Sequence, residues 1–370
     1  MCNEKRIILF TANYTGGILQ FTLEMMAQLI KQGCYVICFV PKGVKISSQL
    51  LSNFNFVFYD KKNTLFNLKK HISVIENIMS YKPDYVWITD HSIVPLQIGK
   101  MIGDKLPTMI TVHDPICHST NQKSVSYIIK STFEKIYLSL AAKKASKILL
   151  LSKFSKEIFL IKHKKYEKKI FQINLGAHII TEKKTKPIEL SNYNQSFILF
   201  FGRIDKYKGI GHFLKGFLEI EDEIESKFII AGNGNLSGEE KELIYRSKKT
   251  IVINRYILDE EMLYLFNNCS CVVLPYTDAT QSGVIPIAYK LGKPVIVSNI
   301  LGLTQFVDNK KTGYVCDNDS DYGEAVKYVL KNASNMGESA LNYYKEYLDF
   351  EKNIRLVLGE MFPEKEEVHS

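Results

Sequence analysis

The chain has 370 residues, which is long for a single hydrophobic core. Hydrophobic residues make up 46% of it and charged residues 24%, a globular composition that excludes a disordered chain. The net charge of +9 is unevenly spread. Residues 1–180 hold 25 Lys and Arg against 11 Asp and Glu, a balance of +14, whereas the remainder holds 23 against 28, a balance of −5. The sequence therefore predicts two domains, of which the first is basic enough to meet an anionic surface or ligand.

No run approaches the roughly 20 apolar residues that a membrane-spanning helix needs, and residues 1–10 lead into a strand-like run rather than a leader peptide. We therefore expect a cytoplasmic protein. The seven cysteines are scattered and form no paired C-x-x-C motifs. This pattern favours reduced, mostly buried thiols over disulfides or zinc, and no metal site is predicted.

In the first half, short apolar runs alternate with stretches of helical spacing. Several runs are apolar throughout, which is typical of parallel strands covered on both faces. The predicted strands are residues 6–13, 35–40, 54–59, 85–89, 109–113, 148–151 and 170–173. The predicted helices between them include residues 18–32, 65–81 and 126–143.

The alternation restarts after residues 181–192, a polar segment without periodicity that is the predicted linker. The predicted strands of the second half are residues 197–202, 228–232, 250–254, 271–275, 294–298 and 312–315. Two such runs predict two doubly wound, Rossmann-like α/β domains, residues 1–180 and 193–370, facing each other across a cleft. Since ligands of open α/β sheets bind beyond the carboxyl ends of the strands, the loops that follow strands are the functional candidates.

Two such loops stand out in the first domain. Gly16 and Gly17 lie between the first strand and a helix, where the backbone can approach an anion closely; a tight turn is the alternative. His113 ends a strand and could hydrogen-bond a substrate, although histidines at strand ends are often structural, and His91 is a weaker candidate.

In the second domain, FFGRIDKYKG places Arg203 directly after a strand and Lys208 before a helix. A planar guanidinium and an ammonium at a helix start suit a diphosphate, with an exposed basic loop as the alternative. The segment 280–284 (TQSGV) precedes another helix, and the amides of Ser282, Gly283 and Val284 could bind phosphate. AGNGN (residues 231–235) is a glycine turn after a strand, and Asp317-Asn318-Asp319 is interpreted as a solvated turn rather than a metal-binding D-x-D motif.

With these loops placed, the chain resembles the retaining GT-B-fold glycosyltransferases of glycosyltransferase family four. The resemblance is carried by the Gly-Gly loop, His-Asp after a middle strand, INLGA (residues 173–177), G-R-(x)-K-G, A-G-N-G and G-K-P-V-I. It implies transfer from a nucleotide-sugar donor with retention of configuration and without metal or cofactor. Arg203 and Lys208 would bind the donor diphosphate, and His113 would contact the sugar. The resemblance also implies a donor-binding set: Gly16, Gly17, Gly202, Gly232, Asn233, Tyr256, Thr280, Gln281, Ser282, Gly283 and Val284.

One departure from the family concerns two glutamates, eight positions apart, that grip the sugar and the ribose. Counting back from GKPVI places Ala279 and Ile287 there. This variant leaves open a non-catalytic partner subunit, and the architecture leaves open a nucleotide-sugar epimerase or a phosphorylase.

The acceptor implied by the resemblance is a glycan or a lipid-linked glycan, as in bacterial-type surface polysaccharide synthesis. The lysine-rich segment from Lys123 to Lys169 includes a predicted helix with Phe133, Ile136 and Leu140, which favours peripheral docking on the inner face of an anionic membrane. An ordinary surface helix is the alternative. The basic half carries no nucleic-acid recognition motif, so no nucleic acid partner is predicted. We also expect the last helix to pack back on the first domain.

Overall fold

A computed structural model describes residues 4–46, 48–61, 67–115, 125–178 and 181–363. These residues divide into two compact units, one of which runs to Asn174 and resumes at Phe350, while the other is Leu175–Asp349. This division differs from the predicted boundary, because residues 181–192 belong to the second unit. There Leu190 is buried in the core, and the Thr185 amide donates to the Glu260 carbonyl at 3.0 Å.

The first unit is built on a seven-stranded sheet in which every neighbouring pair is parallel, in the order β3-β2-β1-β4-β5-β6-β7. All seven predicted strands are confirmed. Alternate residues such as Ile8, Phe10, Val86 and Ile88 face one core. The strands are β1 (Arg6–Phe10), β2 (Tyr35–Pro41), β3 (Asn55–Tyr59), β4 (Tyr85–Ile88), β5 (Thr108–Val112), β6 (Lys147–Leu150) and β7 (Ile170–Gln172).

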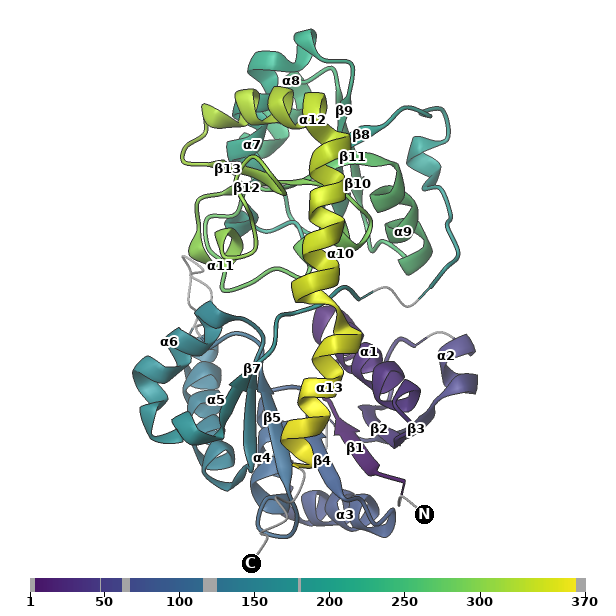
Figure 1. Cartoon of the computed structure of the whole chain (residues 1–370), viewed down its shortest axis with the longest axis vertical. Helices are drawn as coiled ribbons and strands as arrows, with labels where there is room; N and C mark the ends of the chain where they lie inside the picture. Colours follow the sequence, from purple (N-terminus) through teal and green to yellow (C-terminus); the bar gives the residue numbers. More distant parts are fainter. Residues whose placement is uncertain (1–3, 47, 62–66, 116–124, 179–180, 364–370) are drawn as a thin grey trace, which may run out of the picture. The chain divides into compact units, whose positions relative to one another are not determined.

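Helices cover this sheet, as expected for parallel strands that are apolar on both faces (Figure 1). The predicted helices are found as α1, α3 and α5, although residues 65 and 66 lie outside the described part. The helices are α1 (Gly17–Lys31), α2 (Ser48–Asn53), α3 (Leu68–Ser80), α4 (Ile93–Ile102), α5 (Val125–Lys144), α6 (Lys153–His163), the 3-10 helix η1 (Lys164–Lys169) and α13 (Phe350–Met361).

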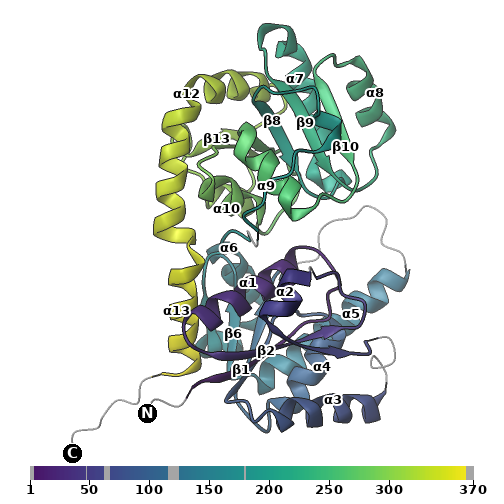
Figure 2. The same ribbon diagram turned by 90° about the vertical axis from the view of Figure 1, so that its right-hand side faces the viewer.

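The last of these, α13, closes the first unit from the far end of the sequence. It lies alongside α1 (Figures 1 and 2), where the ring of Phe350 is 6.3 Å from that of Phe21 and Lys31 forms a 2.6 Å ion pair with Glu351. The α13 residues Phe350, Ile354 and Val357 are buried. The helix is therefore part of the core of this unit.

The second unit contains a six-stranded parallel sheet in the order β10-β9-β8-β11-β12-β13. All six predicted strands are confirmed. They are β8 (Phe197–Phe201), β9 (Lys227–Gly232), β10 (Thr250–Asn254), β11 (Cys269–Leu274), β12 (Val295–Ser298) and β13 (Gly313–Cys316). The helical elements are η2 (Ile188–Leu190), η3 (Lys206–Lys208), α7 (Ile210–Ile220), η4 (Glu221–Glu223), α8 (Gly238–Arg246), α9 (Asp259–Asn268), α10 (Val284–Lys290), α11 (Leu301–Thr304), α12 (Asp321–Tyr343) and the π-helical turn η5 (Tyr344–Leu348).

Aromatic contacts show that both faces of this sheet are covered. Phe228 of β9 packs against Phe213 of α7 with ring centroids 4.5 Å apart, and it pairs in register with Ile198 of β8. Phe201 is three residues further along β8, so it points to the opposite face, where it meets Phe266 of α9 at 5.2 Å. Figure 2 shows α7 and α8 next to each other beside this sheet.

The two strand orders share one topological property. In each sheet the chain winds outward from the first strand in one direction, then returns to the middle and winds in the other direction. The winding reverses between β1 and β4 in the first unit and between β8 and β11 in the second. Ligands of doubly wound sheets bind beyond the carboxyl ends of the strands at these switch points, so the loops after β1, β4, β8 and β11 take the functional positions.

Candidate functional site

The loop after β8 carries both predicted cations. Arg203 is exposed, and its Nη2 donates to the Tyr207 hydroxyl at 3.3 Å while its Nε lies 3.6 Å from an Asp205 carboxylate oxygen. Lys208 ends the 3-10 helix η3, and its Nζ lies 3.6 Å from the ring centroid of Tyr276 and 4.9 Å from that of Tyr207. An ammonium held over an aromatic face is stabilised by about 0.5–2 kcal/mol, depending on how far it is desolvated. Both cations therefore have defined positions at the switch point.

Gly209 allows the loop after β8 to pack closely against the loop after β11. Gly209 has φ +64° and lies so close to the strand end that a Cβ would stand 1.9 Å from the Pro275 carbonyl oxygen. The Thr277 amide also donates to the Tyr207 carbonyl at 2.8 Å. These contacts hold the backbones of the two loops together. We call residues 202–209 and 275–283 together the switch-point loops.

The glycine turn after β9 extends the same assembly. A Cβ on Gly232 would stand 1.8 Å from the Gly202 carbonyl oxygen, so only glycine permits this approach. The Ile204 amide donates to the Asn233 carbonyl at 3.0 Å, and the Asn254 side chain exchanges two 3.1 Å hydrogen bonds with the Gly234 backbone. The structure thus brings Gly202, Gly232 and Asn233 together.

The segment after β11 is more enclosed than predicted. Thr280 and Ser282 are buried, while Gly283 has the side chain of Leu175 as a neighbour, 3.7 Å from where its Cβ would be. The Val284 amide, which we expected to be open to a phosphate, donates to Ser282 Oγ at 3.3 Å. The Ser282 hydroxyl also lies 3.5 Å from the hydroxyl of Tyr276. Ser282 therefore supports this turn from inside.

The two positions aligned with the missing glutamates are both apolar and closed. Ala279 and Ile287 are buried, and a Cβ on Gly302 would stand 2.0 Å from the Ala279 carbonyl oxygen. Helix α11 therefore presses directly on the backbone at Ala279. Neither position supplies a carboxylate to the switch-point loops.

Tyr256 follows β10, the edge strand, and is half exposed. Its neighbour Arg255 makes two-pronged hydrogen bonds to Glu189 and to Glu261 at 2.7–2.9 Å. The hydrogen bonds to Glu261 and Glu189 raise the pKa of Arg255 above its ordinary range. This ion network fixes the backbone on which Tyr256 stands, at the outer end of the same sheet edge.

In the first unit, Asp90 organises the switch point between β1 and β4. This carboxylate is buried and accepts hydrogen bonds from the Ala12 amide at 3.0 Å, Asn13 Nδ2 at 2.6 Å, and the amide and hydroxyl of Ser92 at 2.8 and 3.0 Å. It ties the loop that leads to Gly16 and Gly17 to the loop after β4. Both glycines have open space where a Cβ would be, so a ligand could approach their backbone.

The ring of His113 is buried within the first unit. It is 5% exposed, packs edge-on against Phe21 at 5.1 Å, and its Nε2 lies 2.8 Å from the Thr89 carbonyl oxygen. Burial, with a contribution from the neighbouring His91, lowers its pKa from 6.5 to about 4. The ring is therefore neutral at pH 7, and Nε2 donates to the Thr89 carbonyl. The predicted contact with a sugar stays a prediction.

The late acidic turn is a structural element. Asp319 accepts hydrogen bonds from His212 Nδ1 at 2.8 and 2.9 Å, and Asp317 accepts one from Asn299 at 2.7 Å.

Among the described cysteines, Cys34, Cys38, Cys269, Cys271 and Cys316 are free and buried, as expected. Burial raises the pKa of the Cys269 thiol to about 12, which suits an inert thiol.

Sequence reasoning missed the residues that hold the functional candidates in place. Tyr207 and Tyr276 position Lys208, Asn254 joins two turns, and Asp90 joins two loops. The signals were present, since Tyr276 and Asp90 each come directly after a predicted strand. Polar residues at such positions can equally be solvated turns, so the pattern alone did not select them.

Part of the second unit is similar in sequence to known glycosyltransferases. Residues 195–332 match the family model described as glycosyl transferases group 1. An uncharacterized glycosyltransferase of Methanocaldococcus jannaschii is 24% identical over 177 residues, which cover 41% of this chain and 45% of that protein. The match thus spans less than half of the relative's length.

The whole chain is similar in fold to several solved structures. A glycosyltransferase from Rickettsia africae has a TM-score of 0.75 at 18% identity, covering 98% of this chain and 100% of that one. Anabaena HepE in complex with UDP and glucose has a TM-score of 0.73 at 16% identity, covering 96% and 99%. WaaG, described as a glycosyltransferase involved in lipopolysaccharide biosynthesis, has a TM-score of 0.67 at 13% identity, covering 96% and 100%. The fold, with two Rossmann-like parallel-sheet units, is that of GT-B glycosyltransferases.

Proposed function

We propose that the chain is a glycosyltransferase that moves a sugar from a nucleotide-sugar donor to a glycan or lipid-linked acceptor. The observation that carries this proposal is the placement of Arg203 and Lys208 on the switch-point loops. Two cations and closely packed glycine backbone occupy the position where a doubly wound sheet binds an anionic ligand. The match of residues 195–332 to the glycosyl transferases group 1 model and the UDP-containing complexes of HepE support a nucleoside diphosphate as that anion.

The chemistry asks little beyond charge and position. The bond between the anomeric carbon and the diphosphate oxygen breaks, the acceptor oxygen bonds to that carbon, and the acceptor proton leaves with the diphosphate. Arg203 and Lys208 would stabilise the charge that develops on the leaving diphosphate, an effect that needs no metal. We propose hexosyl or related transfer with retention of configuration, as the family resemblance implies.

Alanine substitution of each cation tests the assignment. Loss of one charged hydrogen bond to a developing anion costs about 2–4 kcal/mol, so Arg203→Ala and Lys208→Ala should each lower turnover roughly 30- to 1000-fold. Lys215→Ala is the control, because Lys215 lies on α7 and forms an exposed ion pair with Glu239 at 2.8 Å. Nucleotide release is measured across a panel of nucleotide-sugars. Turnover near that of the unchanged chain in both loop variants, with the fold intact, would refute the assignment.

A non-catalytic subunit is the second candidate, and the buried Ala279 and Ile287 favour it. A chain of this kind would bind the donor without turning it over and would co-purify with an active transferase. A nucleotide-sugar epimerase would instead release an epimer from donor alone. Incubation with donor, with and without a glycan acceptor, separates the three outcomes.

We further propose that the acceptor is met at the cytoplasmic face of an anionic membrane, in surface polysaccharide synthesis. On α5, the side chains of Phe133, Ile136 and Leu140 are exposed and recur at helical spacing, and Lys143 and Lys144 follow in the last turn. The side chains at the start of the lysine-rich segment, residues 123–131, lie outside the described part. None of the helices among the described residues combines the length and apolarity needed to cross a bilayer.

Vesicle sedimentation tests the membrane proposal. Each lysine near anionic lipid contributes about 1 kcal/mol, so binding to anionic vesicles should exceed binding to neutral ones and should fall at high salt. Ile136→Asp should weaken binding. Ile188→Asp is the matched control, since Ile188 is equally apolar and is exposed on η2 of the second unit, outside the lysine-rich segment. Negligible binding to both vesicle types would leave a soluble acceptor.

A further inference from the structure

A polar hollow of about 410 Å³ lies at the opposite edge of the second-unit sheet from the switch-point loops. It is formed where β8 and β11 begin, whereas the switch-point loops follow the carboxyl ends of the same parallel strands. Its volume is in the range of ordinary small-molecule sites. The residues that line the hollow are Asn194, Gln195, Ser196, Tyr264, Asn267, Asn268, Cys269, Ser270, Gly292, Lys293, Ala333 and Ser334.

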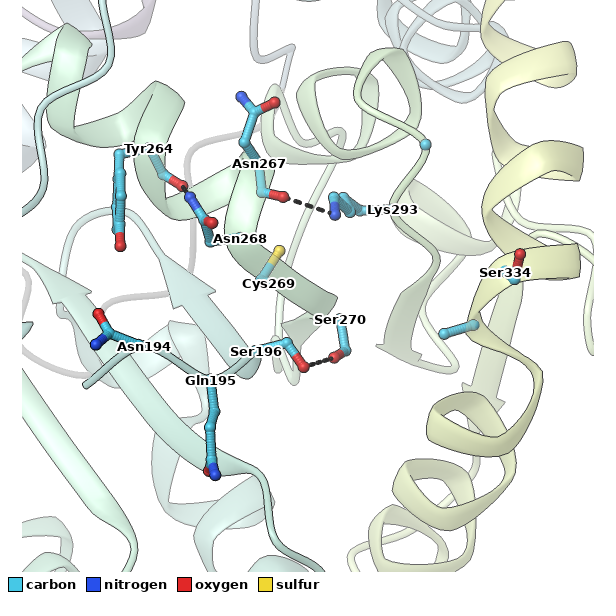
Figure 3. Close-up of a pocket in the computed structure, with 12 residues that line it drawn as sticks. Asn194, Gln195, Ser196, Tyr264, Asn267, Asn268, Cys269, Ser270, Lys293 and Ser334 are labelled. Carbon is cyan, nitrogen blue, oxygen red and sulfur yellow. Dashed lines mark hydrogen bonds between the residues drawn. The ribbon is translucent and has the colours of Figure 1, made fainter.

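The lining has an unusual chemical balance. It contains four side-chain amides, three serine hydroxyls and one phenol, but only one charged group, Lys293, and no carboxylate. In the view of Figure 3, Tyr264 and Asn194 stand on the left of the hollow and Lys293 and Ser334 on the right. Such a surface offers many hydrogen bonds and little net charge.

Local hydrogen bonds fix the orientation of these groups. Asn267 and Asn268 each donate their side-chain NH₂ to the carbonyl four residues back in α9, at 2.7 and 2.8 Å. Ser270 donates to the Ser196 hydroxyl at 2.9 Å, and Lys293 Nζ donates to the Asn267 carbonyl at 2.9 Å (Figure 3). Each amide uses one N–H in this way, so each asparagine keeps its second N–H as a donor and its oxygen as an acceptor.

We propose that this hollow is a second, non-catalytic binding site for a neutral sugar residue of a glycan. A sugar hydroxyl both donates and accepts, so it can use the asparagine oxygens and the ammonium or serine groups together. The phenol ring of Tyr264 offers an apolar surface against which the C–H face of a pyranose packs. A carboxylate-free, nearly neutral lining suits this ligand better than a nucleotide or a cation. The role of this site rests on the proposed function, because a glycan bound here would stay close to a transferase that acts on it. The binding of a sugar to the hollow does not itself require that function.

Ligand-observed saturation-transfer NMR on the full chain tests the site, with a panel of neutral oligosaccharides as the probe. Tyr264→Ala and Asn268→Leu should each weaken oligosaccharide binding at least tenfold. Two control variants remove similar side chains of the second unit that do not line the hollow. Tyr245→Ala removes an equally large ring that is 91% exposed on α8, and Asn332→Leu removes an amide that also donates to the carbonyl four residues back, on α12. Both controls should bind like the unchanged chain.

Binding of UDP, measured in the same samples, separates this site from the switch-point loops. The hollow variants should keep UDP affinity, and Arg203→Ala should keep oligosaccharide affinity. If no neutral oligosaccharide binds, or if binding survives both hollow variants, the second site is refuted whatever the UDP result. Loss of UDP binding in Arg203→Ala alone would then still support the proposed function.

Discussion

The buried His113 makes the acid stability of the first unit a sharp test of its structure. The perturbation is His113→Phe, which keeps an aromatic ring against Phe21 but removes the titrating nitrogens and the hydrogen bond to Thr89. We expect the variant to be less stable at pH 7, because loss of that buried hydrogen bond costs about 1–3 kcal/mol. We also expect it to lose less stability than the unchanged chain when the pH is lowered.

The magnitude follows from the pKa. In the folded chain burial holds the pKa of His113 near 4, whereas an unfolded imidazole titrates at its ordinary 6.5. Because the pKa is lower in the folded chain, only the unfolded chain binds the extra proton between pH 6.5 and pH 4. The contribution of His113 to the free energy of unfolding is therefore fully present above pH 6.5 and is lost as the pH falls towards 4. Between pH 7 and pH 5 this single group should lower the free energy of unfolding by about 2 kcal/mol.

The only tryptophan makes the measurement specific for the first unit. Trp87 is buried in β4, donates to Thr111 at 2.7 Å, and lies edge-on to Phe21 at 6.0 Å. Urea unfolding is therefore followed by tryptophan fluorescence at pH 7 and pH 5. A variant that loses as much stability as the unchanged chain over this range would show that His113 titrates like an exposed imidazole, which would refute its assignment to the core. Turnover per folded molecule, measured alongside, tests its predicted contact with the sugar.

Two further predictions concern the switch-point loops. Tyr276→Leu should weaken UDP binding about 5- to 30-fold, because it removes a ring contact to Lys208 of about 1–2 kcal/mol. Tyr276→Phe keeps the ring and should largely preserve UDP binding. Both affinities are measured by calorimetric titration, and an equal loss in the two variants would refute the ring contact. Gly209→Ala should lower both thermal stability and UDP affinity, because the new Cβ would meet the Pro275 carbonyl oxygen at 1.9 Å. Gly238→Ala is the control and should change neither, because there is open space where its Cβ would be. A Gly209→Ala variant that is as stable as the unchanged chain and binds UDP equally well would contradict the close packing.

The strands and their connections were predictable because buried parallel strands have a simple pattern. Runs such as 197–201 are apolar at every position, and helices on both faces follow from that. The loops were predictable for a related reason, since the topology sends every strand end to the same edge. The sequence therefore placed Arg203 and Lys208 in a loop at this edge, and their binding of a diphosphate stays a prediction.

The remaining features depend on contacts between distant segments. Residues 181–192 are polar but belong to the second unit through Leu190 and Thr185, which a composition profile does not reveal. His113 is polar at the end of an apolar strand, and only the position of Phe21 shows that its ring is enclosed. The polar hollow draws its lining from separate parts of the second unit, none of which forms a motif.

The nested order of the two units has a consequence for how the protein matures on the ribosome. The chain enters the second unit at Leu175 and leaves it at Asp349, so all of that unit is synthesised before α13. The first unit, although its strands emerge earlier, lacks Phe350 against Phe21 and Glu351 against Lys31 until the last helix has been made. Synthesis from the amino end thus reverses the usual sequence of domain completion: the second unit can finish folding while the first still waits for its closing helix.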